Sequence, residues 1–220
     1  MMTRNLVFFA FLWSILNCSC GQKKGATDNT AATHGKNSID TDLAFADSLA
    51  GIALPTGSQD TIGPAISTID IFLKAVTKEE KQYAQNGLIG GISIDKPEQS
   101  LPNLVNPNEM ILPYAKVVVV ADYPLNRPAN FELTTKKGGF SRKEMIEHVS
   151  SIYHSIYRKE EASAKTKTVP AEKREGLINR NETDGEYGIW GHDISDLYLS
   201  YIEVHRSSAG VIYLILGIDS

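Results

Sequence analysis

The sequence predicts an α+β domain: an antiparallel sheet with a C-terminal β-hairpin, packed by one long amphipathic helix and one or two short N-terminal helices. Three segments carry this prediction. They are a β-branched run over 114–121, a capped apolar periodicity over 142–161, and a pair of strand-like runs over 198–218. The strand–helix–strand alternation of a doubly wound fold is missing, so a parallel-sheet architecture is not expected.

The long helix has the clearest sequence signals. Ser141 and Glu144 form an S-x-x-E capping box, and Phe140 and Met145 stand at the spacing of a hydrophobic staple. Apolar residues then recur every three or four positions, which gives the helix one apolar face. We therefore expect a helix over 142–161 that packs on the sheet.

Strands are expected on both sides of this helix. The run YAKVVVVA over 114–121 has the composition of a strand buried on both faces, and NFELT over 130–134 alternates as a second strand. After the helix, the segment over 198–218 predicts a hairpin whose polar turn ends in Gly210. Its second strand is nearly all apolar and is expected near the centre of the sheet, whereas the first is expected nearer an edge.

Two short helices are expected at the start of the domain. Pro64 suits the first turn of a helix, and apolar residues over 66–76 recur at spacings of three and four. Thr77 and Glu80 form a second capping box, which predicts a helix over 78–85.

The first twenty residues have the pattern of an export signal. Arg4 precedes an apolar run over 6–16, which is long enough for a signal sequence and too short to span a bilayer. The run ends in NCSCG, which contains Cys18 and Cys20, and the rest of the chain has no cysteine. This arrangement resembles the lipobox of bacterial lipoproteins, in which the signal is cut before a cysteine that carries a diacylglycerol.

Within this resemblance, two cysteines are candidates for the lipid. Cys20 is favoured because the small Ser19 precedes it at the cleavage point, whereas the unusual Asn17 precedes Cys18. A plain secretory signal with two incidental cysteines is the alternative. With Cys20 as the site, no internal disulfide is possible, so the stability of the fold must come from its core.

The chain then divides into a signal peptide over 1–19, a flexible polar tether over 20–60 and a single domain over 61–220. The signal contains one charged residue, Arg4, so its removal changes the formal net charge from −4 to −5. An acidic protein without a basic cluster is a poor match for nucleic acid. Membrane attachment is expected through the acyl chains, in the bacterial cell envelope, at the periplasmic face or the cell surface.

Side chains that could bind a ligand or take part in catalysis are most concentrated over 179–197, where the sequence is NRNETDGEYGIWGHDISDL. In one interpretation, Tyr187 and Trp190 give a ligand apolar contact at the rim of a pocket, and hydrogen bonds from His192 and Arg180 orient it. In the alternative, the glycines let the backbone turn tightly and the aromatic side chains fill the edge of the core. The candidate binding residues are Arg180, Tyr187, Trp190, His192, Asp193 and Asp196.

Catalytic and metal-binding motifs are absent from the sequence, including H-E-x-x-H, EF-hand, G-x-S-x-G, G-x-G-x-x-G and Walker patterns. His148 and His154 are about 120° apart around the expected helix, so they cannot share one ion from that helix alone. His192 with the aspartates that follow it is the best local cluster, and we expect structural or hydrogen-bonding roles for it. No metal or cofactor is expected.

These features favour a lipid-anchored envelope protein that acts as a binding module for an unknown protein or small-molecule ligand. An envelope enzyme using His192 and Asp193 is one alternative, and a structural partner in envelope assembly is another. A pocket containing Trp190 and His192 would favour binding or catalysis. An exposed apolar patch without a pocket would favour the structural role.

Overall fold

The structure is a computed structural model that describes residues 62–176 and 179–220. The lipobox-like segment with Cys18 and Cys20, the tether over 20–60 and the expected start of the domain at residue 61 lie outside the described residues. Within the described residues, no helix combines the length and the apolar character needed to cross a membrane.

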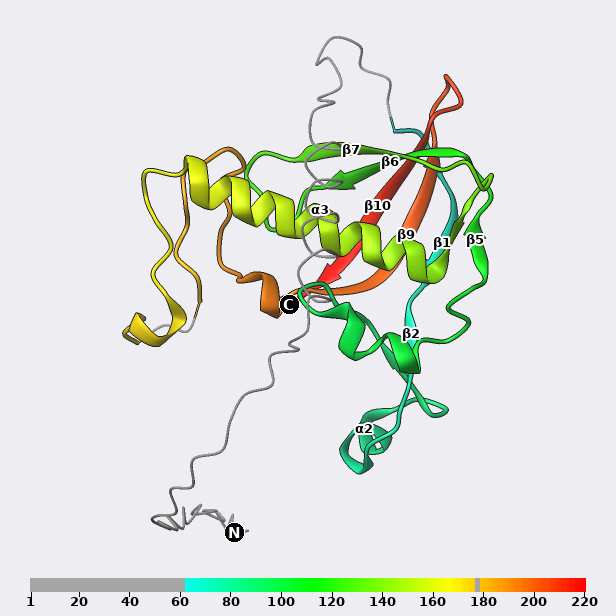
Figure 1. Ribbon diagram of the computed structural model, residues 1–220, viewed down its shortest axis with the longest axis horizontal. Helices are drawn as coiled ribbons and strands as arrows, with labels where there is room; N and C mark the ends of the chain where they lie inside the picture. Colours follow the sequence, from blue (N-terminus) through cyan, green and yellow to red (C-terminus); the bar gives the residue numbers. More distant parts are fainter. Residues whose placement is uncertain (1–61, 177–178) are drawn as a thin grey trace, which may run out of the picture. The chain divides into compact units, whose positions relative to one another are not determined.

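A six-stranded sheet forms the centre of the described part (Figure 1). Its strands are β1 (Ala65–Asp70), β4 (Ile92–Ser93), β6 (Lys116–Ala121), β7 (Ala129–Thr134), β9 (Tyr198–Arg206) and β10 (Ile212–Asp219). The main order is β1-β9-β10-β6-β7, and β4 pairs with β9 off this path. Paired strands are antiparallel, except that β10 and β6 run parallel.

Shorter elements complete the described part. One two-stranded pair joins β2 (Phe72–Lys74) to β3 (Leu88–Gly90), and another joins β5 (Met110–Leu112) to β8 (Phe140–Ser141). The short helix α2 (Lys78–Tyr83) confirms the helix predicted after Thr77, with its reciprocal capping box. The 3₁₀ helices are η1 (Pro97–Gln99), η2 (Leu101–Asn103), η3 (Ala171–Lys173) and η4 (Ile194–Asp196).

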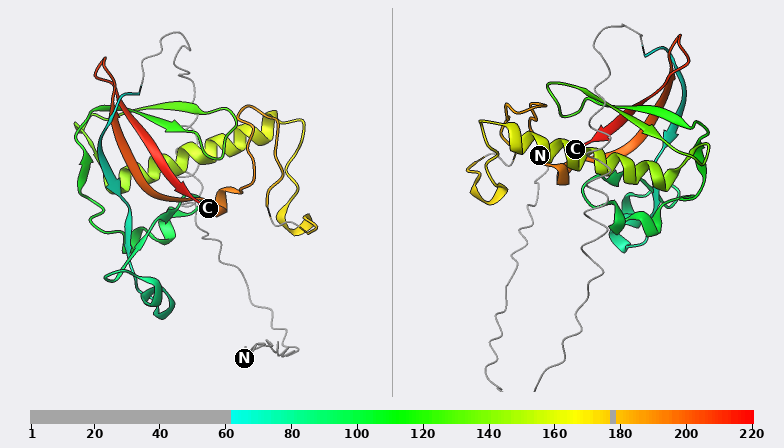
Figure 2. Two further views of the ribbon diagram at one scale, coloured as in Figure 1. Left: turned by 180° about the vertical axis from the view of Figure 1, so that it is seen from behind. Right: turned by 45° about the horizontal axis from the view of Figure 1, so that its top comes forward.

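The long helix α3 (Arg142–Ser163) lies across one face of the sheet (Figure 2). Its start confirms the predicted capping box: the Ser141 hydroxyl accepts from the Glu144 amide, and the Glu144 carboxylate accepts from the Ser141 amide. The buried stripe of α3 belongs to one hydrophobic core with the inner side chains of the sheet. Its largest apolar members are Met145, Ile146, Val149, Ile152, Tyr153 and Ile156.

The opposite face of the sheet carries a second, smaller cluster. Successive side chains of a strand point to opposite faces, so Val117 and Val119 of β6 join the core under α3 while Val118 and Val120 join the other cluster. This confirms a strand buried on both faces within the predicted 114–121 segment, with β6 beginning at Lys116. The remaining members of the second cluster are Tyr213, with Ile62, Val211 and Ile215 packed against it.

The C-terminal hairpin is also confirmed. Strands β9 and β10 pair over most of their length, from Ile212 opposite Arg206 to Asp219 opposite Tyr198. The apolar β10 lies between β9 and β6, and β9 is second from the β1 edge. These positions match the prediction that the second strand of the hairpin is the more central one.

One predicted element is wrong. The segment over 66–76 forms β1 and β2 instead of a helix. Ile66 and Val76, which belonged to the supposed helical stripe, are 46% and 50% exposed, whereas Ile71 is fully buried. Burial instead follows the two-residue period of a strand, because Ile69 and Ile71 both face the core while β1 pairs with β9. The apolar spacing of this segment is compatible with a helix and with a strand, and the pairing of β1 with β9 makes its first part a strand.

Candidate functional site

One buried carboxylate holds the loop over 179–197 against the C-terminal half of α3. Glu160 lies on α3 and is fully buried. It accepts a hydrogen bond from the hydroxyl of Thr183 at 2.6 Å. Three backbone amides of the same loop donate to it at 2.7 to 3.0 Å, those of Gly185, Tyr187 and Gly188. Four donors from one short segment therefore converge on a single side chain.

These donors keep Glu160 ionised. Burial alone would raise the pKa of its carboxyl group, because a charged form is disfavoured away from water. The hydrogen bonds from Thr183 and from the loop amides act in the opposite direction and outweigh burial, so the pKa of Glu160 lies below its ordinary value. The carboxylate is thus a fixed negative charge inside the loop.

The approach of the loop to Glu160 also explains two of its glycines. A Cβ atom at Gly185 would lie 2.5 Å from the carbonyl oxygen of Glu160, which is too close for any side chain. Gly188 has a φ of +67°, in the left-handed region that favours glycine. Both positions therefore fit the interpretation of this stretch as a tightly turned structural loop.

Arg180 forms a second buried contact beneath the loop. It is 5% exposed, and its guanidinium donates to the hydroxyl of Thr183 at 3.2 Å and to the carbonyl of Ile189 at 3.3 Å. Its guanidinium carbon also lies 5.5 Å from the centre of the Tyr157 ring, a cation–π contact. Burial raises the pKa of Tyr157, and its hydroxyl donates to the carbonyl of His192 at 2.9 Å. Helix α3 and the loop are thus joined again next to His192.

Asp193 ties the end of the loop to the preceding charged segment. Its two carboxylate oxygens accept from the Arg174 guanidinium at 2.6 and 2.9 Å, a bidentate pair. The Nε atom of Arg180 lies 3.7 Å from the same carboxylate. The backbone amide of Asp193 donates to the Asp196 carboxylate at 2.9 Å, at the start of η4. Both aspartates therefore make hydrogen bonds to other groups of the protein.

Three aromatic rings meet at the surface of this region. The centre of the Trp190 ring lies 5.2 Å from that of Tyr123 and 5.7 Å from that of His192, both edge-to-face. The Tyr123 and His192 rings are 5.5 Å apart. Trp190 is 37% exposed, and the other two side chains are half-buried. We call Tyr123, Trp190 and His192 the aromatic cluster.

The structure divides the six predicted binding residues into two groups. Trp190 and His192 belong to the aromatic cluster and keep part of their surface exposed. The other four are buried or engaged in internal hydrogen bonds: Arg180, Tyr187, Asp193 and Asp196. These four side chains help to hold the loop in place, and Asp196 among them is also exposed.

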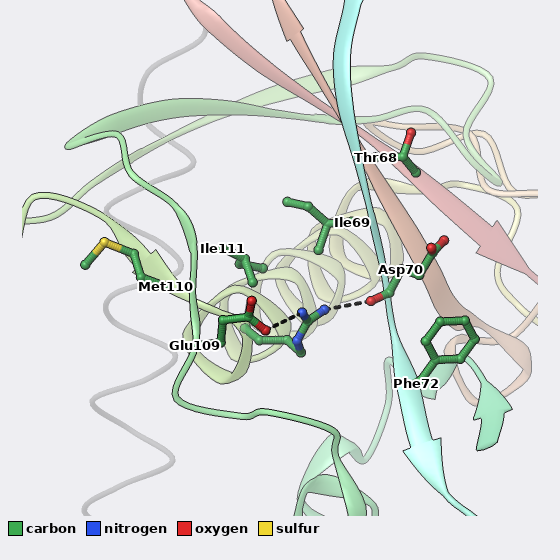
Figure 3. A pocket seen from close by; sticks show the side chains of 8 residues that line it. Thr68, Ile69, Asp70, Phe72, Glu109, Met110 and Ile111 are labelled. Carbon is green, nitrogen blue, oxygen red and sulfur yellow. Dashed lines mark hydrogen bonds and ion pairs between the residues drawn. The ribbon is translucent and has the colours of Figure 1, made fainter. Parts of the chain in front are cut away.

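A groove lies in a different part of the domain, between β1 and β5 (Figure 3). It has a volume of about 420 Å³, and none of the six predicted residues lines it. Its lining side chains are Thr68, Ile69, Asp70, Phe72, Glu109, Met110, Ile111 and Arg142. We call it the β1–β5 groove. Its residues are scattered over three segments without a common motif, so no sequence signal predicted it.

His192 and Asp193 have separate sets of neighbours in the structure. Across 62–176 and 179–220, no group of three or more His, Cys, Asp or Glu side chains is placed to hold a metal ion. Arg174 occupies both oxygens of Asp193, and the ring of His192 packs against Tyr123 and Trp190. Asp193 is thus paired with Arg174, whereas the ring of His192 belongs to the aromatic cluster.

Four contributors to this region were not predicted as such from the sequence: Tyr123, Tyr157, Glu160 and Arg174. Glu160 had a usable signal, because it continues the apolar stripe of α3 four positions after Ile156. A charged residue on a buried face requires polar partners, and the polar loop after the helix supplies them. Tyr123 and Arg174 reach the loop from separate segments and carry no comparable signal.

No protein-family model, curated protein or solved structure matches this chain. Its function is therefore inferred from its own residues and their geometry.

Proposed function

We propose that this protein is a lipid-anchored binding module of the bacterial cell envelope, with the aromatic cluster as its contact surface. The observation that carries the proposal is the exposed ring of Trp190, held edge-to-face against Tyr123 and His192. Trp and Tyr are enriched where binding energy concentrates, because a large rigid side chain supplies much contact area and loses little conformational entropy. The ligand is a protein or small molecule with an apolar surface to place against the ring.

The internal contacts of the loop support this proposal. Glu160 and Arg180 join the loop to α3, and the backbone amide of Trp190 donates to the Pro124 carbonyl at 3.2 Å. The segments that carry the three rings are thus connected before any ligand arrives. A contact surface that is already ordered loses less conformational entropy on binding, so more of the contact energy appears as affinity.

The lipid anchor is tested first. We expect mass spectrometry of the mature N-terminal peptide to find Cys20 as the first residue, with a diacylglycerol on its thiol. Lipid on Cys18 would move the cleavage point by two residues and keep the anchor. An unmodified cysteine, or an N-terminus well downstream of residue 20, would remove the anchor from the proposal.

The contact surface is tested by removing both exposed rings. The double variant Trp190→Ala/His192→Ala should lose the ligands that the unaltered protein captures from envelope extract, with a melting temperature changed by only a few degrees. Tyr83→Ala is the matched control, because Tyr83 is an aromatic residue on α2 with 82% of its surface exposed. A folded double variant that captures every ligand of the unaltered protein would place the site elsewhere. A double variant that unfolds would assign both rings a structural role.

A spectroscopic measurement makes the test independent of capture. The sequence contains two tryptophans, Trp13 and Trp190, and Trp13 lies in the segment expected to be removed as a signal peptide. In the processed protein, Trp190 is then the sole tryptophan and its emission reports on the aromatic cluster alone. A captured ligand that contacts the cluster should shift or quench this emission. Unchanged emission at saturation would exclude contact with Trp190.

A further inference from the structure

β1 presents unpaired backbone groups on one side. The amide of Ile71, directly after β1, donates to the carbonyl of Ser200 in β9 at 2.9 Å, so the backbone groups of Ile69 and Ile71 face β9. Those of Thr68 and Asp70 therefore point to the opposite side, where the Asp70 carbonyl accepts from Arg142 at 2.6 Å. Within the described residues, the amide and carbonyl of Thr68 and the amide of Asp70 have no hydrogen-bond partner. This is the pattern of an open edge strand.

The β1–β5 groove runs along this open edge. Figure 3 shows the side chains of Ile69 and Ile111 directed into the space between the two strands. The Arg142 side chain links the two sides of the groove, because its guanidinium donates to the Asp70 carbonyl at 2.6 Å and to the Glu109 carboxylate at 2.9 Å. β1 has the sequence AISTID, without the lysine or proline that often blocks pairing at an edge, and its irregular register lies at Ala65–Ser67, before the Thr68–Asp70 part that faces the groove.

We propose that the β1–β5 groove binds an extended peptide segment of a basic partner, which adds to β1 as a further strand. Strand addition to an open edge gains affinity from backbone hydrogen bonds and specificity from alternate side chains. Here the amide and carbonyl of Thr68 supply the backbone partners. Apolar side chains of the peptide pack between Ile69 and Ile111, and the alternate side chains lie toward Asp70.

Charge decides between a foreign peptide and a second copy of this chain. Asp70 and Glu109 carry two carboxylates at the groove, against the single positive charge of Arg142. A lysine or arginine of the peptide is attracted by this excess of negative charge. A second copy brings the same acidic groove, and the whole chain carries a net charge of −4, so pairing of two β1 edges is opposed by like charges. This inference is independent of the aromatic cluster.

The test uses the purified full-length protein and a fluorescent octapeptide of alternating valine and lysine, capped at both ends. We expect saturable binding by fluorescence anisotropy, which a matched peptide of valine and glutamate does not show. Thr68→Pro removes the outward amide and should weaken binding by about tenfold or more, because proline cannot donate to an added strand. Thr68→Val keeps the amide and is the matched control. Asp70→Asn should weaken binding of the lysine peptide through the loss of its charge.

Proline is tolerated on an edge strand whose N–H faces solvent, and circular dichroism verifies that Thr68→Pro folds. If it does not fold, hydrogen exchange of the Thr68 amide in the unaltered protein replaces it, and exchange should slow when the peptide binds. Failure of the lysine peptide to bind at millimolar concentration would overturn the proposal. Equal binding by Thr68→Pro, equal binding of both peptides, or unchanged exchange at Thr68 would do the same. A dimer that Thr68→Pro dissociates would identify a second copy as the occupant instead.

Discussion

The two ends of α3 are each fixed by a glutamate, but over very different distances along the chain. At the N-terminal end, Glu144 contacts Ser141, three positions away, and Lys137, seven positions away. At the C-terminal end, Glu160 contacts Thr183 and the backbone beyond it, 23 to 28 positions away. The first end can therefore be recognised as a motif, whereas the second exists only after the fold has brought a loop to the helix.

The two glutamates also differ in their exposure to water. The Glu144 side chain keeps 30% of its surface exposed, whereas Glu160 is fully buried. Water can replace the partners of an exposed group, but it cannot reach donors that a buried group leaves behind. Loss of Glu160 is therefore expected to be far more damaging than loss of the contacts around Glu144.

The largest expected effect is that of Glu160→Ala. It leaves the Thr183 hydroxyl and three backbone amides without their acceptor, and each buried donor left unpaired costs about 1–3 kcal/mol. We expect the free energy of unfolding to fall by at least about 3 kcal/mol, because several such donors are affected. Denaturant unfolding at pH 7 measures the change.

Glu161→Ala is the matched control, because it removes the neighbouring carboxylate from an exposed position on the same turn. It should change the free energy of unfolding by less than about 0.5 kcal/mol. A loss for Glu160→Ala as small as that of Glu161→Ala would mean that the loop is not anchored through Glu160. Glu160 would then not be what holds Trp190 and His192 in position for a ligand.

A smaller effect is expected at the other end of α3. Ser141→Ala removes the side chain that accepts from the Glu144 amide and should destabilise the domain by about 0.5–2 kcal/mol, the usual range for loss of an N-cap. Ser141→Thr keeps a capping hydroxyl and should retain most of the stability. An unchanged denaturant midpoint for Ser141→Ala would indicate that the cap contributes nothing to the fold.

The same contrast explains which parts of the molecule could be predicted from the sequence. The capping boxes and the apolar stripe of α3 depend on neighbours within a few positions, and the hairpin joins two strands that follow each other directly in the chain; all of them were predicted. The segment over 66–76 was assigned wrongly because its apolar spacing fits a helix, while pairing with β9 makes its first part a strand. The parallel pairing of β10 with β6 joins segments almost a hundred positions apart, so no local pattern indicates it.

The candidate site follows the same rule. Trp190 and His192 were predicted from local composition, and both keep part of their side-chain surface exposed. Tyr123 completes the aromatic cluster from a separate segment, and Arg174 fixes Asp193 across a gap of 19 positions. The sequence therefore identifies the residue types near the site, and the fold decides which of them face a ligand.

The smallest expected effect is a pH dependence at the N-terminal end of α3. The Lys137 ammonium, with further hydrogen bonds from Ser141, lowers the pKa of Glu144 from 4.5 to about 2. Because the folded state binds this proton less tightly than the unfolded chain, Glu144 stabilises the fold above about pH 4.5, and this contribution is lost as the pH falls toward 2. The exposure of the pair to solvent limits the effect to below about 1 kcal/mol.

Glu144→Gln isolates this contribution, because glutamine keeps the size of the side chain and its reciprocal cap while it removes the charge. We expect the variant to be less stable than the unaltered protein at pH 7, with a difference that shrinks between pH 4.5 and 2.5. Glu147→Gln is the control. The Glu147 side chain is 48% exposed, and its carboxylate lies 3.6 Å from the Lys143 ammonium, which is too long for a hydrogen bond. Urea unfolding at several pH values compares the three proteins. A constant difference between Glu144→Gln and the unaltered protein would show that the Lys137–Glu144 pair adds no pH-dependent stability, and that the cap alone fixes this end of the helix.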